Sequence, residues 1–113
     1  MRTLADLSRA ERDLLVTLRR RIAADFPGPA FQITLFGSRA RGDAEPDADM
    51  DVLVEIDQDR LDAADRRRLR RIANEISLDS GIVLSLLLVD RDLKDERGDY
   101  SIFENIRDEG IAV

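Results

Sequence analysis

The sequence predicts one α/β (α+β) domain, in which a small mixed sheet of about three to four strands is flanked by helices. The first observation is the order of hydrophobic patterns, which runs helix, strand, loop, strand, helix, strand, helix. The second is the length of 113 residues, which suits one domain that needs no disulfide or metal for stability. No repeat, low-complexity tract or linker divides the chain, so a single domain over residues 1–113 is expected.

The first segment has the pattern of an amphipathic helix. Its apolar residues recur three and four positions apart, at Leu7, Leu14, Leu15, Leu18 and Ile22. Ser8 followed by Glu11 is a capping-box pattern, so the helix is expected to begin near Ser8. It must end by the stretch of residues 26–29, where two prolines and a glycine follow Phe26.

Two strands are expected next. Residues 31–36 alternate apolar and polar side chains and lead directly into Gly37 and Ser38. Residues 38–48 lack core spacing and predict a loop with room for one helical turn. Residues 50–56 predict the second strand. One face would hold Val52, Val54 and Ile56, and the other Asp49, Asp51, Leu53 and Glu55.

The second half predicts a helix, a strand and a last helix. Asp59 or Asp62 can cap the helix, Ser80 and Gly81 end it, and its apolar face is Leu61, Leu69, Ile72, Ala73 and Ile76. Residues 82–89 are almost continuously aliphatic, which predicts a strand buried on both faces. Residues 90–99 are polar and predict a loop. Ile102, Phe103 and Ile106 then suggest a short helix that stops at Gly110.

The composition excludes several kinds of chemistry. The net charge of -6 argues against a general nucleic-acid coat protein, which needs a basic face. The absence of His and Cys excludes disulfides, imidazole or thiolate metal sites and catalytic triads built on either residue. Any metal must be bound by oxygen, which points to a hard cation such as Mg²⁺. No signal core or membrane span is evident, so a cytoplasmic protein is expected.

One stretch carries a pattern with chemical meaning. Gly37 and Ser38 follow a predicted strand, and Asp49 and Asp51 come ten residues later, at the start of the next strand. Carboxylates two residues apart on a strand share a face and repel each other unless a cation lies between them. Gly37 lets a phosphate approach the backbone, and Ser38 offers a hydroxyl and an N–H. The pattern therefore predicts a site for a metal-bound polyphosphate.

Two arginines in the same stretch have two interpretations. Arg39 and Arg41 can bind phosphate oxygens through their planar guanidinium groups. An ion pair with Asp43 or Glu45, on a solvated loop, fits the sequence about as well.

This motif resembles the signature of the minimal nucleotidyltransferases, which belong to the DNA polymerase β-like superfamily. The run from Gly37 to Gly42 is similar to the form found in MNT-type antitoxins of HEPN–MNT toxin–antitoxin pairs. The resemblance covers most of the chain and implies the nucleotidyltransferase fold. It also implies an ATP substrate, with Mg²⁺ ions on Asp49 and Asp51 and the β- and γ-phosphates at Gly37 and Ser38.

The antitoxin branch of the family implies a protein acceptor. AMP would pass to a tyrosine hydroxyl of a HEPN-type toxin, which would silence the partner in a type VII-like toxin–antitoxin pair. The acidic net charge and the short apolar runs predict no direct contact with nucleic acid or membrane. A homo- or hetero-oligomer stays open.

The sequence departs from the family pattern in two places. Ala48 stands where a serine commonly precedes the first aspartate. A third carboxylate usually lies on a later strand, and Ser85 occupies its expected strand here. Glu55 is on the same face as Asp51, but it lies two steps of two residues beyond Asp51, and each step is ~6–7 Å along the strand. Asp90 could reach inward only in another register.

Two alternatives to the antitoxin enzyme stay open. The chain could be a catalytically weak binding module that neutralises its partner by contact. It could also be the nucleotide-binding half of a small-molecule nucleotidyltransferase.

The predicted second helix carries a basic stretch, made of Arg66, Arg67, Arg68, Arg70 and Arg71. It can be a solvated face with helical salt bridges, such as Asp62 with Arg66 or Asp65 with Arg68. It can also be a docking face for an acidic partner or an RNA-binding toxin. Aromatic residues make up only 4%, so platforms for base stacking are not expected.

Overall fold

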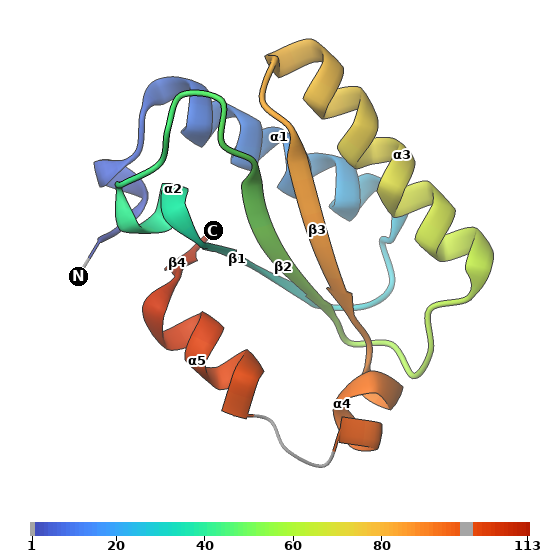
Figure 1. Cartoon of the computed structure of the whole chain (residues 1–113). Coiled ribbons are helices and arrows are strands. Elements are labelled where there is room, and N and C mark those ends of the chain that lie inside the picture. The colour runs from blue at the N-terminus through green and yellow to red at the C-terminus, as the bar shows by residue number, and fades with distance from the viewer. Residues whose placement is uncertain (1, 98–100) are drawn as a thin grey trace.

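The structure, a computed structural model, describes residues 2–97 and 101–113, without the side chains of 96, 97, 101 and 102. Its elements are η1 (Leu4–Asp6), α1 (Arg9–Asp25), β1 (Phe31–Phe36), α2 (Ser38–Arg41), β2 (Met50–Ile56), α3 (Ala63–Ser80), β3 (Leu84–Val89), α4 (Arg91–Arg97), α5 (Ser101–Glu109) and β4 (Ile111–Ala112). Helices flank a four-stranded mixed sheet, as expected (Figure 1). No described helix is long and apolar enough to span a bilayer.

Both long helices begin at the caps that their sequence predicts. The Ser8 Oγ accepts a hydrogen bond from the Glu11 N–H at 3.1 Å, and the Glu11 Oε1 accepts one from the Ser8 N–H at 2.9 Å. Asp62, rather than Asp59, caps α3 by accepting from the Asp65 N–H at 2.7 Å. These bonds satisfy N–H groups that have no partner within the helix.

The sheet has the strand order β3-β2-β1-β4. β2 is antiparallel to β1 and parallel to β3, and α3 provides the crossover that a parallel pair requires. The register places Phe36 and Ser85 on either side of Asp51, one on each neighbouring strand. The end of β1, the start of β2 and the start of β3 therefore lie side by side.

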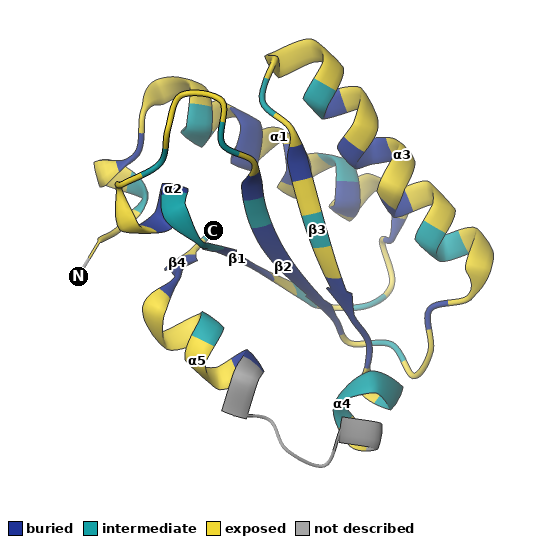
Figure 2. Ribbon diagram, viewed as in Figure 1, coloured by how far each residue is buried: buried dark blue, intermediate teal, exposed yellow. Residues whose placement is uncertain are grey.

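The two faces of the sheet are covered unequally (Figure 2). On one face α1 and α3 enclose the larger core, which includes Leu15, Leu18, Ile22, Leu35, Val52, Val54, Leu69 and Ile72. On the other face Leu53, Val89 and Phe103 form a smaller cluster with Phe36, Leu93 and Ile106. Side chains alternate along β2, so Asp51 lies on this second, thinly covered face.

The expectation that residues 82–89 form a strand buried on both faces is wrong. β3 begins at Leu84 and is an edge strand, and Ser85, Val83 and Leu87 are exposed. Its aliphatic sequence predicts burial, but α3 covers only one face. The second face is open beside Asp51.

The C-terminal third also differs from expectation. Residues 91–97 form α4 instead of a loop, while 98 and 99 lie outside the described residues. The last helix is present over Ser101–Glu109 with Phe103 in the core, although the side chain of residue 102 is not described. β4 pairs Ile111 with Leu35, and its two residues are too short to show an alternating pattern.

Candidate active site

The turn after β1 brings the backbone of Gly37 against the carboxylate of Asp51. Gly37 has φ 76° and ψ −159°, a conformation that residues with a Cβ atom rarely adopt. A Cβ atom at this position would lie 2.6 Å from the Asp51 Oδ2 atom. Glycine is therefore required here both for the turn and for the close approach.

The two aspartates of the motif differ in their surroundings. Asp51 is half-buried within β2, whereas Asp49 is exposed in the loop just before this strand. Burial, together with the negative charge of Asp49, raises the pKa of the Asp51 carboxyl above its usual value. A cation bound by the pair would relieve both effects.

The other residues of the motif take different positions. Ser38 is half-buried at the start of α2, next to Gly37, and no hydrogen bond of its hydroxyl is found among the residues described. Arg41 is exposed and its Nε lies 3.3 Å from the Asp43 Oδ2, so it forms the loop ion pair that the sequence allowed. Arg39 is buried and directed at Glu11 and at loop carbonyls.

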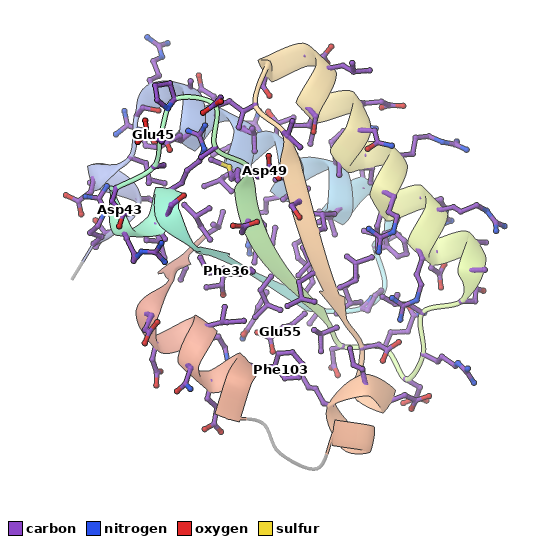
Figure 3. All side chains as sticks on the ribbon, viewed as in Figure 1. Phe36, Asp43, Glu45, Asp49, Glu55 and Phe103 are labelled. Carbon is purple, nitrogen blue, oxygen red and sulfur yellow. The ribbon has the colours of Figure 1, made fainter. Side chains whose placement is uncertain are left out.

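Ser85, which lies on the strand where the resemblance puts a third acid, is a neighbour of Asp51 across the sheet. It is paired in register with Asp51 and is exposed on the same face of the sheet. Glu55 lies towards the opposite end of β2 from Asp49 (Figure 3). It is buried, and its Oε2 lies 2.8 Å from the Lys94 Nζ and 3.8 Å from the Arg107 Nη1. Glu55 therefore belongs to an ion-pair cluster between the sheet and the C-terminal helices.

Asp90 has a structural role instead of reaching the acid pair. It is 2% exposed, and its two oxygens accept hydrogen bonds from the N–H groups of Leu61 and Leu93, both at 2.8 Å. The bond to Leu93 caps α4, and the bond to Leu61 fixes the segment that precedes α3. Asp90 thus orders the junctions around β3.

The donor set of the site fits a magnesium ion that is shared with a substrate. Within residues 2–97 and 101–113, no group of three or more acidic side chains could hold a metal by itself. Asp49 and Asp51 provide two carboxylates, and Mg²⁺ is commonly bound by one or two carboxylates together with substrate phosphates.

A cavity of about 240 Å³ adjoins Asp49 where the edge of β3 meets α3. Its polar lining includes Ser85, Arg70 and Asn74. Arg70 is exposed and has no ion-pair partner in the part of the chain that is described. Sequence reasoning placed Arg70 in a basic stretch and missed its proximity to Asp49, because only the packing of α3 beside β3 brings them to one cavity.

Comparison with known proteins points to one family. Residues 15–108 match the sequence model of a protein family that is described as "Nucleotidyltransferase domain". A candidate nucleotidyltransferase from Sulfolobus solfataricus, solved by crystallography, superposes with a TM-score of 0.50 and 23% sequence identity. The match covers 79% of this chain and 80% of that one, and at this identity it shows a shared fold. No curated protein matches the sequence significantly.

Proposed function

We propose that this chain, which belongs to the nucleotidyltransferase domain family, transfers AMP from ATP to a hydroxyl group of a protein. The observation that carries this proposal is the contact between the Gly37 backbone and the Asp51 carboxylate, with Asp49 beside it. The site combines this glycine turn with Asp51 on the thinly covered face of the sheet and with Asp49 in the loop just before β2. This arrangement suits a polyphosphate with its cation.

In this proposal the residues of the chain bind the cation and orient the phosphates of ATP. Asp49 and Asp51 would hold Mg²⁺, which supplies Lewis-acid polarisation of phosphoryl oxygens and lowers the pKa of a bound hydroxyl. The missing side chain of Gly37 makes room for the Asp51 carboxylate beside the turn. The Ser38 hydroxyl, which has no hydrogen-bond partner among the described residues, would be offered to phosphate oxygens at the next position. The acceptor hydroxyl would lose its proton to solvent, and its oxygen would bond to the α-phosphorus of ATP as the bond from that phosphorus to the leaving pyrophosphate breaks. Positioning and charge compensation would contribute most of the rate.

For the acceptor, we propose a tyrosine of a HEPN-type toxin, with the chain as its antitoxin. The basic stretch of α3 supports a protein partner, because the helical salt bridges Asp62–Arg66 and Asp65–Arg68, which the sequence allowed, are not among the ion pairs of the described residues. Asp62 and Asp65 hydrogen-bond to each other's backbone N–H groups. Arg66 pairs with Asp90 at 3.4 Å, and Arg68 lies over the Phe26 ring at 5.1 Å.

Three arginines of this stretch remain available to a partner. Arg67, Arg70 and Arg71 are exposed, and none has an acidic partner among the described residues. We name these three residues the arginine face. It continues into the cavity beside Asp49 through Arg70, so a partner bound there would also approach the acid pair. An acidic surface flanking the acceptor hydroxyl is the best match for it.

A second candidate function is neutralisation of the partner by binding alone. It is favoured by Ser85, which leaves the acid pair without a third carboxylate on β3. In that case the arginine face would bind the partner, and the two aspartates would not be needed for neutralisation.

The two functions are separated by one experiment. The protein is incubated with ATP labelled at the α-phosphate, Mg²⁺ and the protein encoded next to it, and label on that protein is followed. Asp49→Asn is expected to abolish labelling, while Asp47→Asn, an exposed acid of the same loop, is expected to leave it intact. No label with the wild-type protein rejects adenylyl transfer. Neutralisation that survives Asp49→Asn supports binding alone.

A further inference from the structure

The sequence allowed Arg39 either a phosphate contact or an ion pair with Asp43 or Glu45 on a solvated loop, but its side chain is directed into the protein. The side chain is 9% exposed and lies between the start of α1 and the loop of residues 42–48. Its guanidinium group donates four hydrogen bonds, which go to Glu11, Pro46 and Ala48. Because its guanidinium group is bonded to these partners, Arg39 does not face a ligand at Gly37.

The bonds of Arg39 converge on the residue that precedes Asp49. Its Nε and Nη2 atoms lie 3.0 and 2.7 Å from the Ala48 carbonyl oxygen. Nη2 also lies 3.2 Å from the Pro46 carbonyl oxygen. Two carbonyls of an irregular loop are therefore held by one side chain, close to the backbone that carries Asp49.

Asp49 lies between two anchored neighbours. It precedes β2 and has no partner in the strand registers. Ala48 is held on one side by Arg39, and on the other side the Met50 N–H donates to the Val83 carbonyl at 2.8 Å. If the first anchor is released, the Asp49 carboxylate loses its fixed relation to Asp51, which β2 and Gly37 still hold.

Glu11 completes the device by orienting the guanidinium. Its Oε1 accepts from the Ser8 N–H at 2.9 Å and its Oε2 from the Arg39 Nη1 at 3.2 Å. The Glu11 side chain is only 14% exposed, so this pair is shielded from solvent far more than a surface ion pair. The N-terminal cap of α1 is thus connected through Glu11 and Arg39 to the loop of Asp49.

We infer that Arg39 is a positioning residue, which keeps the Asp49 carboxylate beside the Asp51 carboxylate for metal binding. Glu11 supports it by orienting the guanidinium group. This inference rests on the proposed function, in which the two aspartates share a cation. Groups that orient a metal ligand commonly change metal affinity by about 10- to 100-fold when they are replaced. A lysine keeps the charge of Arg39 but lacks the planar fork that reaches both loop carbonyls and Glu11.

The test measures binding of Mn²⁺, which reports on the site without any turnover. Free Mn²⁺ is followed by electron paramagnetic resonance during titration of the purified protein. Arg39→Lys is expected to raise the Mn²⁺ dissociation constant about tenfold, and Asp49→Asn is expected to abolish binding. Arg21→Lys is the matched control, because Arg21 forms a 2.6 Å ion pair with Glu75 between α1 and α3, away from the site. It is expected to bind Mn²⁺ as the wild type does.

The outcomes separate this inference from the function on which it rests. If the wild type binds Mn²⁺ through Asp49 and Arg39→Lys binds equally well, the positioning role is rejected and the proposed function stands. If the wild type binds no Mn²⁺, either alone or together with a non-hydrolysable ATP analogue, both are rejected. Should Arg39→Lys not fold, Glu11→Gln replaces it, because it retains Arg39 and removes only one charged partner. A several-fold loss of affinity is then expected, and unchanged affinity rejects the role.

Discussion

The carboxylate of Asp51 lies so close to Gly37 that a Cβ atom at position 37 would stand 2.6 Å from its Oδ2 atom. Asp51 lies in β2, and Gly37 directly follows Phe36, the residue of β1 that pairs with Asp51. The glycine turn and one of the two proposed metal-binding carboxylates are therefore one structural unit.

Replacement of this glycine should damage the site and the fold together. Gly37→Ala must place a side chain at φ 76° and displace the Asp51 carboxylate. We expect a loss of about 1–3 kcal/mol in the free energy of unfolding, the usual cost of such backbone strain, and loss of nucleotidyl transfer. Urea unfolding and the labelling assay measure both. Gly28→Ala is the control, because a Cβ atom there would meet nothing within 4 Å.

Asp51 is expected to lower the stability of the folded protein, although the proposed metal site needs it. Burial and the charge of Asp49 raise its pKa, so the ionised form is disfavoured in the folded protein. Asp51→Asn should therefore unfold at a higher temperature than the wild type at pH 7 in EDTA, although it abolishes Mn²⁺ binding. Thermal unfolding by circular dichroism checks this, with the exposed Asp47→Asn as control. A lower melting temperature for Asp51→Asn would contradict the expectation.

The Glu11 carboxylate should stabilise the fold only when it is ionised. Burial alone would raise its pKa, but hydrogen bonds from Ser8 and Arg39 outweigh burial and lower it below 4.5. Its contribution is therefore fully present above pH 4.5 and is lost as the pH falls through the lowered pKa of the folded state.

Glu11→Gln should consequently cost about 1–2 kcal/mol of unfolding free energy at pH 7, and the difference from the wild type should shrink below pH 4.5. Urea unfolding at several pH values measures it. The exposed pair of Asp13 with Arg9, at 3.8 Å, offers the control variant Asp13→Asn, which should change little. A difference that stays constant from pH 7 to 3 would reject this account.

Reversal of charge on the arginine face should weaken the partner complex. Arg67→Glu combined with Arg70→Glu is expected to raise the dissociation constant at least about tenfold, because each change also adds repulsion. Surface plasmon resonance against the partner measures it. Arg20→Glu changes an exposed arginine of α1 that has no ion-pair partner among the described residues, and it should have a much smaller effect. Equal losses in both variants would indicate a response to net charge only.

A third carboxylate can be introduced where the register allows it. Ser85 is paired with Asp51 and exposed on the same face, so Ser85→Asp should tighten Mn²⁺ binding about tenfold. It should also lower the melting temperature without metal, since it adds repulsion. Leu87→Asp adds the same charge one step further along that face and serves as control. Equal gains in affinity would show that general negative charge, rather than position, is responsible.

Local signals in the sequence were sufficient for most of the framework. The caps at Ser8 and Asp62 and the alternation in β1 and β2 depend on residues a few positions apart, and the structure confirms them. The spacing of Gly37 and Ser38 from the two aspartates likewise indicated the family before any fold was known. Such features are readable because they are set by bonds within one turn of helix or one strand.

Other features were decided by contacts between distant segments. The sequence could not show that Arg39 reaches Glu11, 28 positions away, instead of facing a phosphate. Nor could it show that β3 is an open edge, that Asp90 holds Leu61, or that Arg70 reaches the cavity of Asp49. An arginine or aspartate carries the same charge and donors in every setting, and only the packing of helices against the sheet selects its partner. The residue types of this site were thus determined by sequence, and their roles by tertiary structure.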